Sequence, residues 1–282
     1  MTYQQLWRRL VPLYDSGEAK AIVRTLLEER FGMSMADILC YDTDGMAESD
    51  AVALEDMLRR LMAAEPVQYV LGEALFMGRR FHVEPGVLIP RPETETLCQW
   101  VEETCPNDAP AILDIGSGSG CIAITLALDI PNAQVTALDI SPKALEVTRL
   151  NAQALDAHID ILQTDILSPD DETSSTAAKT YDIIVSNPPY ICVSESGAMH
   201  PNVLQHEPDI ALFVPNDDPL LFYKAIAHHA HHALRPGGMV FFECNPAYLD
   251  ATAVMLCQEG FHQVETRDDN YGKKRFCKAT FL

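Results

Sequence analysis

The chain has 282 residues, 48% hydrophobic and 22% charged, a composition typical of a globular protein with room for one large and one small domain. Its 20 basic and 41 acidic residues give a net charge of −21, which disfavours binding along a nucleic-acid backbone. The absence of a long apolar run, a secretory signal and a C-x-x-C pair among the eight cysteines predicts a cytoplasmic protein without a membrane span, disulfide framework or zinc site.

Residues 1–72 predict a small bundle of short amphipathic helices. Apolar residues recur at helical spacing, as in Leu6, Leu10 and Leu13, and glycines separate the helices. No residue pattern typical of catalysis occurs in this segment. We therefore interpret it as a domain for substrate recognition.

Residues 73–92 predict a hairpin and a linker. Short strand-like runs stand on either side of Gly78 and Arg79. Pro90 and Pro92 then stiffen the approach to a helix that begins near Glu93. Residues 93–282 would form a second domain, and Arg91 at the joint is equally consistent with a surface position and with the mouth of a cofactor site.

From residue 111 onward predicted strands alternate with helices, which indicates an α/β fold with a mostly parallel sheet. The strand at 111–115 leads into a glycine-rich loop and then a helix. Glycine at alternate positions allows a ligand to approach the backbone closely, and the helix N-terminus adds amide donors. The candidate ligand-binding residues of this loop are Gly116, Ser117, Gly118, Ser119 and Gly120.

Acidic residues follow the next two predicted strands, residues 134–138 and 159–163. Asp139 lies 19 positions after Gly120, close to the spacing at which a carboxylate accepts a ribose hydroxyl in nucleotide-binding units. Asp165 and Ile166 are candidates for contacts with an adenine amino group and ring face, although a turn residue is the favoured interpretation of Asp165 considered alone. The D-x-G-x-G-x-G spacing differs from the dehydrogenase fingerprint G-x-G-x-x-G.

The strand predicted at 181–186 ends in Asn187-Pro188-Pro189-Tyr190. Two consecutive prolines leave the backbone few conformations, and ligands of open α/β sheets bind at the carboxyl ends of strands. We therefore expect fixed acceptor oxygens here for a substrate that carries an –NH2 group. A strand-terminating turn is the simpler interpretation of Pro-Pro considered alone.

The remaining sequence predicts a polar surface loop at 168–180 and a long connection at 191–219 that forms a wall beside the substrate. A helix at 220–234, a strand at 239–244, a helix at 247–258 and a terminal antiparallel strand pair follow. His228 and His232 are spaced to share a helix face. Without an acidic or cysteine partner at ligand spacing, a polar helix face is favoured over a metal site.

With these segments the chain resembles the class I methyltransferases that use S-adenosylmethionine. More closely it resembles the PrmC/HemK family, which methylates a glutamine in peptide chain release factors. The resemblance spans nearly the whole chain and rests on residues 66–72, 88–95, 114–120, 185–191 and 207–212. Asn-Pro-Pro-Tyr marks amino-group methyltransferases in general, and the Ile-Pro-Arg-Pro-Glu-Thr-Glu stretch after a helical domain narrows the resemblance to this family.

The resemblance implies a Rossmann-like sheet with helices on both faces. It also implies that residues 116–120 and Asp139 bind S-adenosylmethionine, that Asn187 contacts both cofactor and substrate, and that residues 187–190 hold the glutamine. Asn187, Pro188 and Tyr190 would be catalytic. Ile166 stands where some members carry an aromatic residue beside adenine, which weakens stacking.

The expected reaction yields an N5-methylated glutamine and S-adenosylhomocysteine. We expect a cytoplasmic monomer that acts on release factors and binds no metal, membrane or nucleic acid. The alternative is an amino methyltransferase of a DNA or RNA base, which the net charge of −21 disfavours. An adaptor that binds the cofactor without catalysis is a further alternative, which the intact Asn-Pro-Pro-Tyr makes less favourable.

Overall fold

The computed structural model describes residues 1–42, 45–105, 109–168 and 180–282. Its chain divides into two compact units, residues 1–74 with 199–206 and residues 75–198 with 207–282. Most of the polar loop predicted at 168–180 lies outside the described residues. No helix within the described ranges is long and apolar enough to cross a membrane.

The smaller unit consists of helices, as the periodicity predicts. Its helices are α1 (Tyr3–Arg8), α2 (Ser16–Phe31), α3 (Met35–Leu39), α4 (Glu48–Met62), α5 (Val67–Leu71) and α9 (Pro201–His206). Side-chain caps start three of them: Thr2, Asp15 and Ser34 each accept a hydrogen bond from a backbone amide of the first turn. The apolar faces of the helices from α1 to α5 meet in one core, which includes Leu6, Leu27 and Leu58.

Residues 199–206 pack with the helical unit, although the sequence placed them in the long connection of the second domain. The ring of His200 stacks on Tyr14 at a centroid distance of 5.7 Å. A ring nitrogen of His206 lies 3.1 Å from the carbonyl oxygen of Ala63. This segment is therefore part of the smaller unit.

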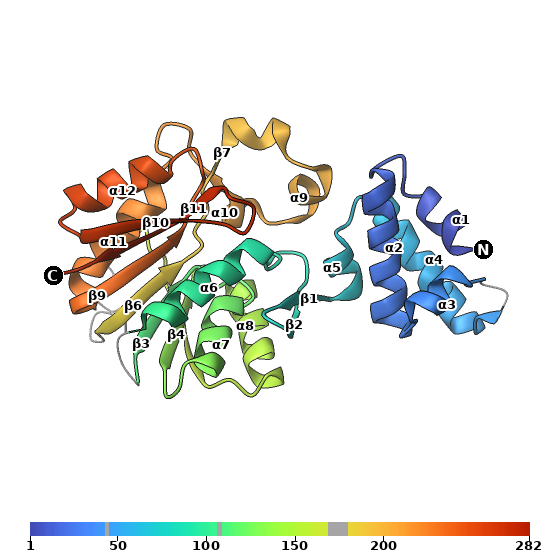
Figure 1. Cartoon of the computed structure of the whole chain (residues 1–282), viewed down its shortest axis with the longest axis horizontal. Coiled ribbons are helices and arrows are strands. Elements are labelled where there is room, and N and C mark those ends of the chain that lie inside the picture. Colours follow the sequence, from blue (N-terminus) through green and yellow to red (C-terminus); the bar gives the residue numbers. More distant parts are fainter. Residues whose placement is uncertain (43–44, 106–108, 169–179) are drawn as a thin grey trace. The chain divides into compact units, whose positions relative to one another are not determined.

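Within the described residues of the larger unit, seven strands form one sheet in the order β10, β11, β9, β6, β3, β4, β5 (Figure 1). The bounds are β3 (Ala111–Ile115), β4 (Gln134–Asp139), β5 (Ile159–Gln163), β6 (Tyr181–Ser186), β9 (Leu234–Glu243), β10 (His262–Asp268) and β11 (Lys274–Thr280). β9, β6, β3, β4 and β5 are parallel, whereas β11 is antiparallel to both β9 and β10. The expected mostly parallel sheet with a terminal antiparallel pair is confirmed.

Helices cover both faces of this sheet (Figure 1). One core contains residues of α6 (Pro92–Thr104), α7 (Cys121–Asp129) and α8 (Pro142–Ala154), and the other contains residues of α11 (Leu221–Ala233) and α12 (Leu249–Gln258). Adjacent strand residues alternate between the cores, since Ile112 belongs to the first and Leu113 to the second. Burial on both faces explains why the central strands are continuously apolar.

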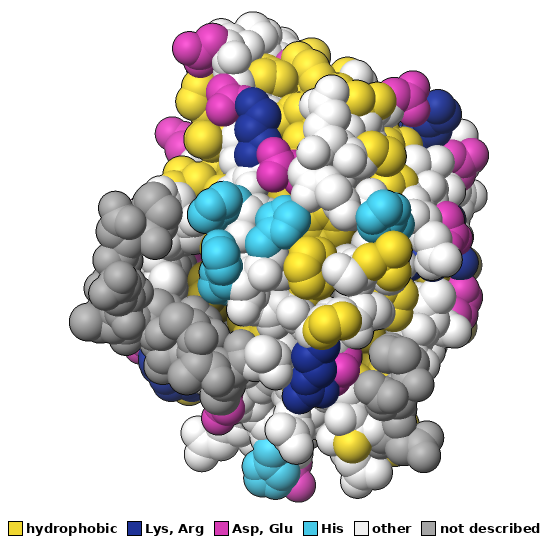
Figure 2. All heavy atoms as spheres, turned by 90° about the vertical axis from the view of Figure 1, so that its left-hand side faces the viewer, with side chains coloured by type: hydrophobic (Ala, Val, Ile, Leu, Met, Phe, Trp, Pro, Cys, Tyr) yellow, Lys and Arg dark blue, Asp and Glu magenta, His cyan; other side chains and the backbone are white. Residues whose placement is uncertain are grey.

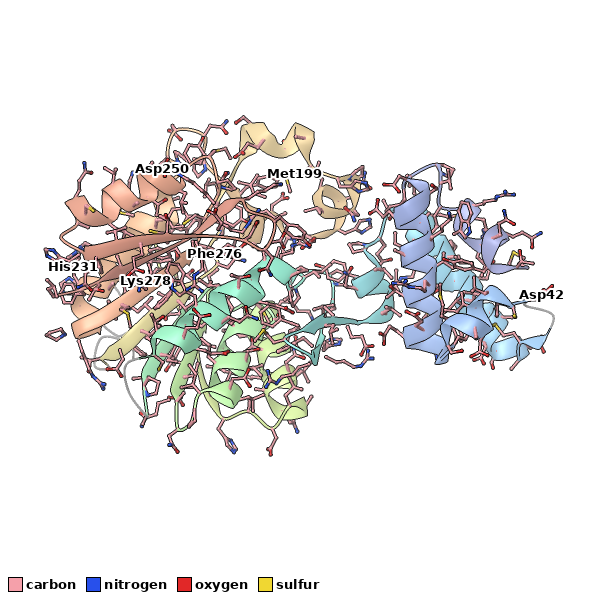
Figure 3. The ribbon with its side chains drawn as sticks, viewed as in Figure 1. Asp42, Met199, His231, Asp250, Phe276 and Lys278 are labelled. Atoms are coloured by element: carbon pink, nitrogen blue, oxygen red, sulfur yellow. The ribbon has the colours of Figure 1, made fainter. Side chains whose placement is uncertain are left out.

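Strand β11, between β10 and β9, also contributes to the first of these cores. Phe276 and Lys278, both labelled in Figure 3, are two residues apart and therefore on the same face of the strand. Phe276 is fully buried, and the ammonium group of Lys278 lies 5.5 Å from the ring centroid of Trp100 while it pairs with Glu265 at 2.8 Å. The charge of Lys278 is thus compensated at a buried position.

Several element boundaries differ from the prediction, and for two of them the structure gives the reason. β9 begins at Leu234, because the Arg-Pro-Gly-Gly segment, expected as a loop, continues pairing: Gly237 donates to the carbonyl of Phe281 and Phe281 donates to that of Gly238. The hairpin of β1 (Glu73–Phe76) and β2 (Arg79–His82) turns at Met77 and Gly78, one residue earlier than expected. Both turn residues have positive φ, 48° and 74°, as tight hairpin turns require.

The connection at 191–219 contains short elements rather than irregular chain alone. β7 (Ile191–Cys192) pairs in parallel with β8 (Phe213–Val214), and α10 (Asp209–Leu212) immediately precedes β8. A 3-10 helix, η2 (Val193–Ala198), follows β7. These pairings fix the segment that follows Asn-Pro-Pro-Tyr.

Strand order reverses between β3 and β6. The chain leaves β3 for β4 and β5 on one side and returns to β6 on the other. Such a switch point opens a crevice at the carboxyl ends of the strands, where ligands of this fold class bind. The glycine-rich loop after β3 and the Asn-Pro-Pro-Tyr segment after β6 both start at this crevice.

Candidate active site

A cavity of about 210 Å³ lies in the larger unit at the carboxyl ends of β3, β4, β5 and β6. The structure brings most of the sequence-predicted site residues to its walls: Gly116, Ser117, Gly118, Ser119, Asp139, Asp165, Ile166, Asn187, Pro188 and Pro189. Gly120 and Tyr190 are not among the lining residues. The cavity is otherwise mainly apolar, as is usual for small-molecule sites.

The glycine loop presents bare backbone to open space. Gly116 and Gly118 have φ of 81° and 56°, and a side chain built on either would meet no atom within 4 Å. The amides of Gly116 and Ser117 donate to the carbonyl of Leu138 at 2.8 and 3.0 Å, which holds the loop against β4. The loop is therefore fixed by the protein while its outer face is free to accept a ligand.

Gly120 has a different function in the loop. A Cβ at this position would stand 2.9 Å from Thr148 Cγ2 and 3.0 Å from Ile124 Cδ1. Its φ of 80° and its place as the N-cap of α7 also favour glycine. In this structure the residue permits close packing of α7 and α8.

Asp139 is held by the loops that flank it. Its Oδ2 accepts from the amide of Gly118 at 2.9 Å and its Oδ1 from the amide of Ser141 at 2.8 Å. Burial raises the pKa of this carboxyl group, and the backbone hydrogen bonds oppose that rise. Each carboxylate oxygen retains a lone pair, so the side chain is suited to accept hydrogen bonds from ribose hydroxyls.

Asp165 and Ile166 lie at the same cavity after β5. The carboxylate of Asp165 accepts from the amide of Leu167 at 2.9 Å and from the hydroxyl of Ser168 at 3.0 Å, so the side chain also stabilises its own turn. Ile166 is partly buried and packs against the sheet core. The two residues offer an acceptor and an apolar surface.

These features fit S-adenosylmethionine. S-adenosylmethionine is a nucleoside with a charged tail. The exposed glycine backbone allows it to approach closely, the Asp139 carboxylate is placed for its ribose, and the apolar side chains suit its adenine ring. In addition, Ser117 Oγ and Ser119 Oγ are buried and have no hydrogen-bond partner within the described residues, so donors and acceptors remain on this loop.

The Asn187 side chain belongs to a hydrogen-bonded network that the sequence did not reveal. Its Nδ2 donates to Thr94 Oγ1 at 3.2 Å, and Thr94 Oγ1 donates to Glu243 Oε2 at 2.7 Å. The other carboxylate oxygen of Glu243 accepts from the Tyr190 hydroxyl at 3.1 Å. Thr94 and Glu243 are 2% and 1% exposed, so both belong to the supporting structure of the site.

Tyr190 was expected to pack against the substrate amide. In the structure its ring is partly buried and packs against the sheet core, and its carbonyl accepts from Asn245 Nδ2 at 3.2 Å. Burial, with the neighbouring Glu243, raises the pKa of its phenol. The hydroxyl is thus directed at Glu243 and anchors the end of the Asn-Pro-Pro-Tyr segment.

Arg91 lines the cavity and pairs with Glu207. Its Nη2 donates to Glu207 Oε1 at 2.6 Å, and the amide of Ile89 donates to Oε2 at 3.2 Å. The Glu207 side chain is 1% exposed and that of Arg91 31%. The ion pair links the segment before α6 to the segment before α10. Pro208 and Ala211, which follow Glu207 in the chain, line the same cavity as Arg91.

The His cluster lies on α11, and Figure 2 shows several His side chains on the face that this helix occupies. The rings of His228 and His232 pack edge to face with centroids 5.6 Å apart, and His231 (labelled in Figure 3) packs against Phe261 and Phe281. Across the described ranges, no three His, Cys, Asp or Glu side chains gather in a way that would hold a metal ion. The ring contacts that the structure shows for His228, His231 and His232 are packing with one another and with phenylalanine side chains.

Comparison with known proteins identifies the family. The PrmC N-terminal domain model matches residues 5–72, and the methyltransferase small domain model matches residues 92–206. The release factor glutamine methyltransferase of Bacteroides thetaiotaomicron is 42% identical over 96% of this chain and 95% of that protein. The protein of the same name from Flavobacterium psychrophilum is 36% identical over 98% of this chain and 97% of that protein.

Solved structures agree on the fold. A methyltransferase from Pyrococcus furiosus matches with a TM-score of 0.55 and 16% identity over 80% of this chain and 98% of its own. The Thermus thermophilus 16S rRNA N2 G1207 methyltransferase, solved with AdoMet and guanosine, matches with a TM-score of 0.52 and 22% identity over 74% of this chain and 50% of its own. From the domain models and the identity across nearly its full length, the chain belongs to the family of release factor glutamine methyltransferases.

Proposed function

We propose that this protein transfers the methyl group of S-adenosylmethionine to the side-chain amide nitrogen of a glutamine in a peptide chain release factor. The observation that carries the proposal is Asn187 at the carboxyl end of β6, beside the glycine loop of the same cavity. Its amide nitrogen is bound to Thr94, which leaves the amide oxygen for a donor from the substrate. The names of the relatives support release factors as the substrate class.

The reaction requires orientation more than activation. The lone pair of a carboxamide nitrogen is delocalised into its carbonyl, so the nitrogen is a poor nucleophile. S-adenosylmethionine, when bound, supplies a methyl group on a sulfonium that needs no further activation. Asn187 Oδ1 and the backbone carbonyl of Pro188 accept the two hydrogens of the glutamine amide, which orients its nitrogen and stabilises the positive charge that develops on it. As the bond from nitrogen to the methyl carbon forms, the bond from that carbon to sulfur would break and leave S-adenosylhomocysteine. The methylated nitrogen is positively charged and acidic, so it would then lose its extra proton to water without a strong base.

The rest of the cavity holds the cofactor. In this proposal Gly116 and Gly118 provide the backbone surface, Asp139 accepts from the ribose, and Asp165 and Ile166 meet the adenine. Tyr190, through its hydrogen bond to Glu243, anchors the Asn-Pro-Pro-Tyr segment that would hold the glutamine. Residues 1–72 would recognise the release factor as a folded protein.

The proposed setting is the cytoplasm, with the protein acting as a monomer on a protein substrate. A net charge of −21 disfavours binding along a nucleic-acid backbone. The alternative is a base amino methyltransferase, which would use the same Asn-Pro-Pro-Tyr acceptors. Comparable methyl transfer to an oligonucleotide and to a release factor would favour that alternative.

The direct test is mass spectrometry of a release factor incubated with the protein and S-adenosylmethionine. A mass increase of one methyl group on the glutamine is expected. Asn187→Ala should reduce turnover by roughly 10²-fold or more, the scale of losing one preorganised polar contact. Unchanged turnover in that variant would contradict the assigned role of Asn187.

A further inference from the structure

Three buried or partly buried side chains from different elements form a chain of hydrogen bonds behind the substrate side of the cavity. Asn187 follows β6, Thr94 lies in the first turn of α6, and Glu243 ends β9. The distances are 3.2 Å from Asn187 Nδ2 to Thr94 Oγ1 and 2.7 Å from Thr94 Oγ1 to Glu243 Oε2. Of these residues Thr94 and Asn187 line the cavity, whereas Glu243 lies behind them.

The direction of each hydrogen bond follows from the chemistry of the groups. A carboxylate only accepts, and a hydroxyl has one hydrogen to donate. Once Thr94 has donated to Glu243, its oxygen can only accept from Asn187. The side-chain amide of Asn187 has a donor end and an acceptor end, so it must direct its nitrogen at Thr94 and its oxygen away from it.

The surroundings of Glu243 keep it an acceptor, so the hydrogen bonds run from Asn187 through Thr94 to Glu243. Its second oxygen accepts from Tyr190 at 3.1 Å, so hydroxyl donors occupy both ends of the carboxylate. Burial raises the pKa of Glu243, while the hydrogen bond from Thr94, the positive charge of Arg275 and the hydrogen bond from Tyr190 oppose the rise. A carboxylate 1% exposed is stable only with such partners.

We propose that Thr94 is a positioning residue that determines which end of the Asn187 amide faces the substrate, with Glu243 as the acceptor that fixes the direction. The inference rests on the proposed function, because it gives Asn187 Oδ1 a substrate hydrogen to accept. Without the Thr94 hydroxyl, the Asn187 amide is free to rotate by half a turn and present its nitrogen instead.

The proposed arrangement also predicts substrate discrimination. A glutamine amide offers two hydrogens to Asn187 Oδ1 and the Pro188 carbonyl. A glutamate carboxylate at the same place would put acceptors against acceptors and be rejected. With the Asn187 amide reversed, its nitrogen would instead donate to that carboxylate, so the preference for glutamine over glutamate should weaken.

The test compares Thr94→Val, which removes the hydroxyl at nearly constant shape, with Thr94→Ser, which keeps it. Thr96→Val is the matched control, because Thr96 is 7% exposed on the same helix and its hydroxyl oxygen has no partner within the described residues. Methylation kinetics are measured on the release factor. Binding is measured in the presence of S-adenosylhomocysteine, for the release factor and for its variant with the target glutamine changed to glutamate.

Thr94→Val should lower kcat by roughly tenfold or more, the scale of one hydrogen bond near a reacting group, with little change in affinity for S-adenosylhomocysteine. The ratio of the two release-factor dissociation constants should move toward one by a similar factor. Thr94→Ser and Thr96→Val should both stay within about threefold of wild type, because neither change removes a hydrogen bond of the network.

The variant Asn187→Ala distinguishes a failure of the positioning role of Thr94 from a failure of the proposed function. If it loses methylation while Thr94→Val keeps both wild-type kcat and wild-type discrimination against glutamate, the role of Thr94 is wrong and the proposed function stands. If Asn187→Ala methylates the release factor normally, the proposed function fails first. In the Asn187→Ala background Thr94→Val should have no further effect on kcat, since its action passes through Asn187. A full additional loss in that background would show that Thr94 acts on structure alone.

Discussion

Removal of the Arg91 guanidinium should destabilise the larger unit by leaving Glu207 buried without its ion partner. The Glu207 side chain is 1% exposed, and in Arg91→Ala its carboxylate would keep the amide of Ile89, at 3.2 Å, as a donor. Breaking a buried pair costs about 3–5 kcal/mol. Because the Arg91 side chain is 31% exposed, solvent screens the pair, and we expect Arg91→Ala to lower the free energy of unfolding by about 2–3 kcal/mol.

Glu207→Gln should cost less, about 1 kcal/mol, because it removes the charge and keeps an acceptor for Ile89. In the Glu207→Gln background the further change Arg91→Ala should cost under about 1 kcal/mol, since no buried charge remains to be left alone. The measurement is urea unfolding of the full chain, with Lys224→Ala as the control. Lys224 pairs with Asp218 at 2.7 Å with side chains 50% and 36% exposed, so its loss should be small. An Arg91→Ala variant as stable as Lys224→Ala would refute the reasoning.

Three further predictions concern the cofactor side of the cavity. Gly120→Ala should lower the melting temperature more than Gly116→Ala, because its Cβ would stand 2.9 Å from Thr148 Cγ2, whereas Gly116 meets no atom within 4 Å and has only the strain of positive φ, about 1 kcal/mol. Asp139→Asn should weaken S-adenosylhomocysteine binding roughly tenfold or more in calorimetry, since a charged acceptor becomes a neutral amide. Burial raises the pKa of Asp114 to about 8, so between about pH 4 and 8 the native state binds more protons than the unfolded state, and stability should fall as pH rises through that window. Asp114→Asn should flatten that dependence in urea unfolding at several pH values, and an unchanged slope would contradict the assignment.

Strands and helices whose residues follow a local apolar periodicity could be predicted from the sequence. Strands at 111–115 and 181–186 have their predicted bounds, because continuous apolar runs between polar turns leave few alternatives. The alternation of strands and helices also predicted that the glycine-rich loop and the Asn-Pro-Pro-Tyr segment both follow parallel strands, at whose carboxyl ends ligands bind. That β3 and β6 are neighbours with the crevice between them is a finding of the structure, and the sequence joined the two segments at one site only through the family resemblance.

Contacts between residues far apart in sequence could not be predicted in this way. Thr94 and Glu243 are 149 positions apart, and Arg91 and Glu207 are 116 apart. Thr94 lies within the Pro-Glu-Thr-Glu stretch that the sequence analysis singled out, and Glu243 ends a strand parallel to β6, but neither fact pairs them. The start of β9 at Leu234 was also missed, because a Pro-Gly-Gly segment reads as a loop unless a neighbouring strand is known to pair with it.

The polar groups of the cavity are arranged to orient a substrate rather than to remove a proton from it. Among the described residues that line the cavity there is no His or Lys, and its two carboxylates, Asp139 and Asp165, each accept two hydrogen bonds from the protein. The buried carboxylate of Glu243 does not line the cavity and accepts from Thr94 and Tyr190. Such a site suits a carboxamide nitrogen, which needs fixed acceptors for its two hydrogens and a nearby electrophile. A hydroxyl substrate, whose attack requires a base, would meet only the carboxylates of Asp139 and Asp165, which already accept hydrogen bonds from the protein.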